Sequence, residues 1–187
     1  SKESEIYSWI ATYGTEVYNQ SLLGAYALLR QCNRDVEFFT DAELTEEGLG
    51  GFDFLCFPAA FCMNPEKVVV VEEFVKNGGT VMFEAFAGMI DLTTGMHADN
   101  LPGCGLTDVC GLKLEAAYSS SMIDNAYNWK MVNNSPEEIL LYAGEERLSG
   151  WKHLLRYRLG RAEVLAEFTD RSPAIFSVPI GKGRMIH

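Results

Sequence analysis

A chain of 187 residues with 48% hydrophobic and 22% charged residues has the composition of an ordinary globular protein that can bury a sizeable core. Its formal net charge of −11 argues against nucleic acid or an anionic membrane surface as a partner, because both are bound through clustered Lys and Arg. No apolar run approaches the roughly 20 residues that a transmembrane helix requires, so no membrane partner is expected.

The first predicted element is a helix that begins after Thr15 and continues to Cys32, because its apolar residues recur at helical spacing. Gly24 inside this helix suggests close packing on a neighbour. Val36–Phe39 is predicted as a short strand, and Asp41–Leu44 as the first turn of a small helical piece. The polar start of the chain contains no strand, although parallel sheets commonly begin with one. The chain is therefore expected to be a trimmed piece that starts inside a domain.

The segment Phe52–Gly88 carries the clearest pattern. Two apolar runs, Phe52–Phe57 and Thr80–Phe83, flank a predicted helix that Asn64 can cap and Gly78 can end. Four consecutive valines would also suit a strand, but the spacing of apolar and charged residues around them favours the helix. A strand, a helix and a second strand in this order are typical of a parallel sheet.

The character of the chain changes after this unit. Residues 89–110 form a long predicted loop with a short helix, Leu106–Cys110, and Lys113–Tyr118 follows as a strand. From Ile139 to His187 the alternation has period two, which is typical of antiparallel strands. The predicted fold is a single α/β domain over residues 1–187, with a mostly parallel sheet flanked by helices and antiparallel strands toward the C-terminus.

The cysteine pattern argues against a metal site. The five cysteines form no C-x-x-C pair, and the three histidines are scattered, so neither a metal nor another cofactor is expected. Reduced, mostly buried thiols indicate a reducing compartment and hence a cytoplasmic location. Cys32 and Cys56, in apolar surroundings, are predicted to lie in the core, whereas Cys62 and Cys104 fall on predicted loops.

The most specific candidate for chemistry follows the strand that ends at Phe83. Residues 84–88 have the spacing of a G-x-S-x-G nucleophile elbow, with Phe86 at the nucleophile position. A phenyl ring cannot attack a substrate, so Glu84, Ala85 and Phe86 are interpreted as a degenerate elbow without a catalytic residue.

Two other candidates are weighed against simpler interpretations. Cys62 lies near a strand end and could act as a displaced nucleophile, but no histidine stands in a recognisable partner motif. Glu84 and Asp91 could form the carboxylate pair of a glycosidase. The simpler interpretation is that Glu84 accepts hydrogen bonds from backbone at the strand end and that Asp91 caps a turn.

Four segments together resemble one family: FDFLCFPAAFCM, EEFVKNGGTVMFEAFAGMID, PGCGLTDVCGLKLEA and EVLAEFTDRSPAIFSVPIGKGRMIH. Their order is similar to that of the middle, trimerisation domain of glycoside hydrolase family 42 β-galactosidases, within the class I glutamine amidotransferase-like superfamily. The resemblance covers nearly the whole chain, and none of its motifs is a catalytic signature. It implies a flavodoxin-like sheet that has lost the amidotransferase cysteine, with the galactoside-cleaving carboxylates in a preceding TIM barrel that this chain does not contain.

The expected function is therefore a noncatalytic, oligomerising domain that supports the TIM barrel of a β-galactosidase-like glycoside hydrolase, with a homo-trimer as the parent assembly. Met89, Met96, Tyr127 and Trp129 are candidate interface residues, because interfaces favour these residue types. Two alternatives stay open at this point. One is an independent amidotransferase-like enzyme, and the other is a sugar-binding module in which Tyr127, Trp129 and Trp151 supply stacking faces.

Overall fold

The computed structural model describes residues 1–12, 14–119, 138–141, 147–149, 153–168 and 171–187. The helices in these ranges are α1 (Lys2–Thr12), α2 (Glu16–Gln31), α3 (Pro65–Lys76) and α4 (Leu106–Cys110). The strands are β1 (Phe54–Phe57), β2 (Cys62–Met63), β3 (Thr80–Phe83), β4 (Ile90–Asp91), β5 (Leu112–Ser119), β6 (Glu138–Leu141), β7 (Arg147–Ser149), β8 (His153–Leu159), β9 (Glu163–Phe168), β10 (Pro173–Ile180) and β11 (Gly183–Ile186).

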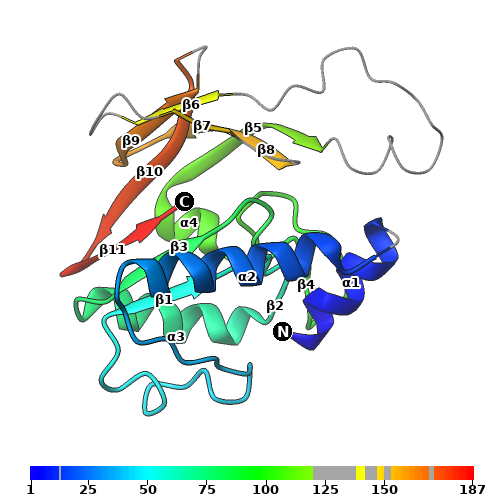
Figure 1. Cartoon of the computed structure of the whole chain (residues 1–187), viewed down its shortest axis with the longest axis vertical. Coiled ribbons are helices and arrows are strands. Elements are labelled where there is room, and N and C mark those ends of the chain that lie inside the picture. The colour runs from blue at the N-terminus through cyan, green and yellow to red at the C-terminus, as the bar shows by residue number, and fades with distance from the viewer. Residues whose placement is uncertain (13, 120–137, 142–146, 150–152, 169–170) are drawn as a thin grey trace.

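The largest sheet has seven strands in the order β1-β3-β11-β10-β9-β6-β7. β3 pairs in parallel with both β1 and β11, and the remaining neighbours pair antiparallel. In Figure 1 the parallel strands lie among the helices, whereas β6, β7, β9 and the far end of β10 extend away from them. The predicted mixed α/β fold, with parallel pairing in its first part and antiparallel strands toward the C-terminus, is confirmed.

The β1–α3–β3 unit forms for the local reasons that the sequence indicates. The side chain of Asn64 accepts a hydrogen bond from the backbone N–H of Glu66 at 3.0 Å, and Gly78 just past the helix has a φ of 121°. Val71 and Val75 are fully buried, and α3 packs on β3, β10 and β11. The run of valines is thus helical, as its spacing predicts.

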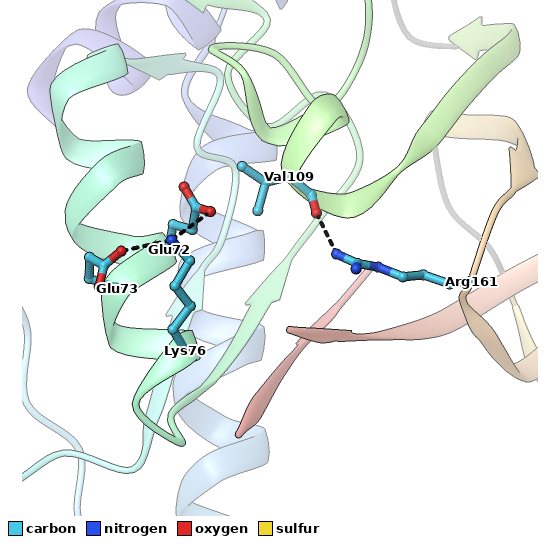
Figure 2. A network of polar contacts seen from close by, with 5 residues as sticks. All are labelled: Glu72, Glu73, Lys76, Val109 and Arg161. Atoms are coloured by element: carbon cyan, nitrogen blue, oxygen red, sulfur yellow. Dashed lines mark hydrogen bonds and ion pairs between the residues drawn. The ribbon is translucent and has the colours of Figure 1, made fainter. Parts of the chain in front are cut away.

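Figure 2 shows polar contacts at the end of α3 and at α4. Lys76 at the end of α3 lies 3.0 Å from Glu72 and 2.7 Å from Glu73, both on its own helix. Arg161, between β8 and β9, donates from Nη2 to the backbone carbonyl of Val109 in α4 at 3.1 Å. The ion pairs of Lys76 are exposed and contribute little to stability, whereas the Arg161 contact links the antiparallel half of the sheet to the helical half.

One hydrophobic cluster runs through both halves of the chain. Val81 in β3, Leu106 in α4 and Phe176 in β10 all belong to it, and each is at most 1% exposed. Burying an aliphatic or phenyl side chain of this size stabilises the folded state by about 1.5–3 kcal/mol. Because residues so distant in sequence share one core, the helical and antiparallel parts stabilise each other.

Several predictions for the N-terminal part are wrong. Residues 2–12, for which no element is predicted, form α1, and Val36–Phe39 pairs with no strand in the described ranges. Asp41–Leu44 forms turns instead of a helix. Gly24 is exposed, and a Cβ placed on it would have no neighbour within 4 Å, so it packs closely on no segment that the structure describes.

Within the described ranges, no helix combines the length and the apolar character that crossing a membrane requires.

Candidate functional site at the strand ends

The carboxyl ends of β1 and β3 define the place where this class of fold positions functional side chains. Phe57 and Phe83, the last residues of the two strands, are opposite each other in the parallel register. Residues 58–60 and 84–88 therefore leave the sheet at the same edge. Ligands of open parallel sheets bind at this edge, so the residues that follow the two strands form the candidate site.

Glu84 directly follows β3 at this edge, and one oxygen of its carboxylate accepts two hydrogen bonds. Its Oε2 accepts from the backbone N–H of Ala59 at 3.1 Å and from the hydroxyl of Ser21 in α2. The carboxylate thus holds together α2, the turn after β1 and the end of β3. The simpler interpretation of Glu84, as a side chain that bonds backbone at a strand end, agrees with this geometry. Removing the carboxylate would leave the Ala59 N–H and the Ser21 hydroxyl without this acceptor. Each donor that is buried would then lower the free energy of unfolding by about 1–3 kcal/mol.

Phe86 has the backbone of an elbow but not its chemistry. Its φ is 65°, which is rare for a bulky side chain, and its ring is only 8% exposed. The tight turn is closed by hydrogen bonds from Ala87 N to Glu84 O at 3.3 Å and from Met89 N to Phe86 O at 3.1 Å. The chain then continues into β4, whereas a nucleophile elbow leads into a helix.

Cys62 is not a loop residue as predicted, because it lies in β2 and is 5% exposed. Burial raises the pKa of its thiol to about 11, although a hydrogen bond with Ser4 opposes the increase. A thiol that stays protonated at neutral pH is a poor nucleophile. This geometry argues against the amidotransferase alternative, which depends on Cys62.

Asp91 caps a turn, which agrees with the simpler of the two interpretations of this residue. Its Oδ1 accepts from the backbone N–H of Thr93 at 2.7 Å and of Thr94 at 3.3 Å. Both carboxylates of the suggested glycosidase pair are therefore engaged with their own surroundings. In the part of the chain that the structure describes, no group of three or more His, Cys, Asp or Glu side chains is arranged to hold a metal ion.

The predicted interface residues have different surroundings. Met89 is half-buried against the hydrophobic core, and Met96 is 69% exposed. Tyr127, Trp129 and Trp151, on which the sugar-binding alternative depends, lie outside the described residues.

The sequence interpretation missed exposed apolar side chains on the first two helices, which contact each other. Its members are large hydrophobic side chains that are about half exposed or more: Ile6, Trp9, Ile10, Leu23 and Leu28. The sequence contains a signal for these exposed side chains, because both helices carry more apolar residues than one buried face requires. In α2, for example, Val17 is the residue that is buried. We refer to these five residues as the α1/α2 apolar surface.

The described chain is thus a mixed α/β domain whose strand ends hold structural hydrogen bonds and whose first two helices expose apolar side chains. Residues 15–187 match the family described as the β-galactosidase trimerisation domain, and the chain belongs to this family. Members of such a family serve assembly and carry no catalytic centre of their own. No curated protein matches the chain.

Solved structures with the same fold include two β-galactosidases. The enzyme from Bacillus circulans sp. alkalophilus is 21% identical with a TM-score of 0.58, over 72% of this chain and 19% of that one. The polyextremophilic enzyme from the Antarctic haloarchaeon Halorubrum lacusprofundi is 17% identical with a TM-score of 0.59, over 74% and 19%. A cytoplasmic protein from Salmonella typhimurium LT2 is 15% identical with a TM-score of 0.53, over 86% and 72%. The chain therefore spans about a fifth of the length of either β-galactosidase.

Proposed function

We propose that this chain holds together the subunits of a larger β-galactosidase-like glycoside hydrolase as a homo-trimer, beside a TIM-barrel domain that carries the catalytic carboxylates. The observation that carries this proposal is the α1/α2 apolar surface. Large hydrophobic side chains that stay exposed on two contacting helices are candidate contacts with other proteins. Membership in a trimerisation family supplies the kind of partner, which is another subunit.

Trp9 and Leu23 are the strongest anchors of this surface. Trp9 is 62% exposed and Leu23 is 65% exposed, so each has a large apolar area left to bury. A few buried side chains, Trp above all, provide most of the free energy of association in protein interfaces. Met96, which is 69% exposed, is a further candidate contact, and Met89, Tyr127 and Trp129 remain candidates from the sequence.

Light scattering on the polypeptide that carries this chain tests the proposal. The double substitution Trp9→Glu with Leu23→Glu is expected to convert the trimer into monomers, because it places charge on the apolar surface. Val69→Glu is the matched control, since Val69 is 59% exposed on α3, which is not part of the surface. A trimer that survives the double substitution would exclude this surface, and a monomeric wild type would exclude the assembly role.

We further propose that residues 1–187 form one flavodoxin-like, class I amidotransferase-like domain that has lost its nucleophile. Two features support this assignment: the parallel β1–α3–β3 unit and the positive φ of Phe86 directly after β3. Mass-spectrometric limited proteolysis tests it, because a single domain should resist cleavage between the α3 and β10 regions until it unfolds. Early separation of two stable fragments at that boundary would contradict the single-domain assignment.

A cytoplasmic location is part of the same proposal. Cys32, Cys56, Cys62, Cys104 and Cys110 are all free, which suits a reducing compartment. The Salmonella protein with a similar fold is described as cytoplasmic. Cell fractionation of the natural host tests the location directly.

A further inference from the structure

α2 carries Leu23 and Leu28 of the α1/α2 apolar surface, but it packs sparsely on the rest of the domain. Val17 is the buried residue of this helix. α1 is the one described element with which α2 shares more than isolated contacts. The place of α2 relative to the sheet therefore depends on few interactions.

A cavity of about 1340 Å³ runs along β1, between this strand and α2. Leu22, Ala25 and Leu29 of α2 line the cavity, and so do residues 53–58, which include β1. The three α2 residues recur at helical spacing, so they lie on one side of the helix. This side borders a cavity, whereas α3 packs fully buried valines on its strands. Apolar packing therefore holds α2 less firmly than it holds α3.

Glu84 supplies a polar contact that joins α2 to the sheet. Its Oε2 accepts from the backbone N–H of Ala59 at 3.1 Å and from the hydroxyl of Ser21. Ala59 is 2% exposed and has a φ of 44°, so a tight, buried turn fixes the amide that holds the carboxylate. Hydrogen bonds to a carboxylate are stronger than those between neutral groups. Ser21 lies two residues before Leu23, so the contact reaches α2 close to the exposed apolar side chains.

The α1 half of the same surface is attached to the domain in a comparable way. The hydroxyl of Ser4 bonds to both backbone groups of Cys62, and Ser4 is fully buried. Cys62 lies in β2, which follows β1 closely, and Glu84 comes directly after β3. Each helix of the α1/α2 apolar surface is thus joined, through a serine hydroxyl, to residues that follow the strands of the parallel pair.

We propose that Glu84 is a positioning residue for subunit association. Through Ser21 it sets the place of α2, and with it the places of Leu23 and Leu28 on the α1/α2 apolar surface; this role rests on the assembly function proposed above. An interface whose two halves are already in place does not lose free energy on ordering them when subunits meet. The residue after β3, at the edge where other parallel sheets bind ligands, here holds a helix that serves association.

Hydrogen exchange and light scattering on the polypeptide that carries this chain test the role of Glu84. Ser21→Ala removes the contact with α2 and leaves the bond between Ala59 and Glu84 in place. Exchange is measured in the background of Trp9→Glu with Leu23→Glu, so that association cannot protect α2. We expect the α2 amides to exchange at least about tenfold faster in Ser21→Ala, with the α3 amides unchanged. Without the background substitutions, the concentration at which half of the subunits associate should rise at least about threefold.

Two further variants are the controls. Ser21→Thr keeps the hydroxyl and should restore both the exchange rates and the association to wild-type values. Gln20→Ala is the matched control, because Gln20 is exposed on α2 and its side-chain amide donates to Glu16 on the same helix. This substitution should change neither measurement.

Wild-type exchange of the α2 amides in Ser21→Ala would overturn the role of Glu84, and a trimeric wild type would then still support the proposed assembly function. Faster α2 exchange with unchanged association would also overturn it, because the place of α2 would not matter for assembly. Equally faster exchange in α2 and α3 would overturn it too, since Ser21 would then act on the stability of the whole domain. A monomeric wild type would refute the assembly function and the role of Glu84 together.

Discussion

Ser4 and Cys62 are joined by two hydrogen bonds, because the Ser4 hydroxyl donates to the Cys62 carbonyl at 3.3 Å and accepts from the Cys62 N–H at 3.0 Å. Ser4 is fully buried, and the pair attaches α1 to β2. An unpredicted helix is thereby fixed at the strand-end edge of the domain, next to the cavity along β1.

Replacing Ser4 by Ala should lower the free energy of unfolding by about 1–3 kcal/mol, because both backbone groups of Cys62 lose their partner in a buried place. Urea denaturation measures the change. Glu5→Ala on the same helix is the control, and as an exposed substitution it should change stability by no more than about 0.5 kcal/mol. Equal stability of the two variants would mean that the Ser4–Cys62 pair does not hold α1 in place.

The thiols should react in an order that differs from the sequence prediction. Cys32 is exposed and Cys56 is only half-buried, so neither lies in the core as predicted. Burial raises the pKa of Cys56 and of Cys110 to about 12. We expect a thiol reagent to modify Cys32 first and to reach the buried Cys62 and Cys110 only after denaturant is added. Peptide mapping after timed labelling identifies the modified sites, with Cys32→Ser as the control that should remove the fast phase. Early labelling of Cys62 would contradict its buried position in β2.

Stability should fall in mild acid because of His187. Its Nδ1 is buried and has no hydrogen-bond partner among the described residues, and its ring packs on Tyr157 at 4.9 Å and on Phe176 at 5.3 Å. Burial lowers the pKa of His187 from 6.5 to about 4. In this pH range the folded state therefore binds fewer protons than the unfolded state. The neutral, buried His187 contributes its full share of the free energy of unfolding above about pH 6.5. This share is lost as the pH falls toward 4, by up to about 3 kcal/mol.

Comparison with His187→Phe isolates that contribution, since carboxylates also titrate in this window. The free energy of unfolding, measured from pH 7 to pH 4, should depend less steeply on pH in the variant. Parallel curves for the two proteins would refute the assignment to His187.

The same substitution should have opposite effects at two glycines. A Cβ on Gly103 would overlap the carbonyl of Gly88, so Gly103→Ala should destabilise the fold by about 1–3 kcal/mol. A Cβ on Gly24 in α2 meets nothing within 4 Å, so Gly24→Ala should stabilise it by about 0.5–1 kcal/mol through its better helix propensity. Thermal unfolding of the two variants beside the wild type measures both signs, and a destabilising Gly24→Ala would contradict the open surroundings of that position.

Neither nitrophenyl galactoside nor glutamine should be turned over by this chain. Amide cleavage by the amidotransferase route needs a thiolate with an oriented histidine, whereas Phe86 occupies the elbow position and Cys62 is buried with a raised pKa. Glycoside cleavage needs two free carboxyl groups, and both Glu84 and Asp91 bind backbone N–H groups. Glutaminase activity that Cys62→Ala abolishes in a folded protein would refute this reading.

Elements whose cause is local were predictable. The cap at Asn64, the left-handed Gly78 and the buried valines of α3 are all within one helix, and the pattern of each is complete in the sequence. The short helix Leu106–Cys110 was predicted with the same bounds that the structure has. The functions of the residues after β3 were predictable in part. A phenyl ring cannot be a nucleophile, so Phe86 excludes one at its own position whatever the fold.

By itself, the sequence determined the helices α2, α3 and α4, the strands β1 and β3, the absence of a nucleophile at Phe86 and the family. Only the tertiary structure decided what depends on a distant partner: that Ser21 and Ala59 share the carboxylate of Glu84, and that Cys62 is buried and Cys32 is not. It also decided that Val36–Phe39 is not a strand here. The physical reason is that a helix satisfies its hydrogen bonds internally, whereas a strand exists only beside another strand, and the place next to β1 is a cavity.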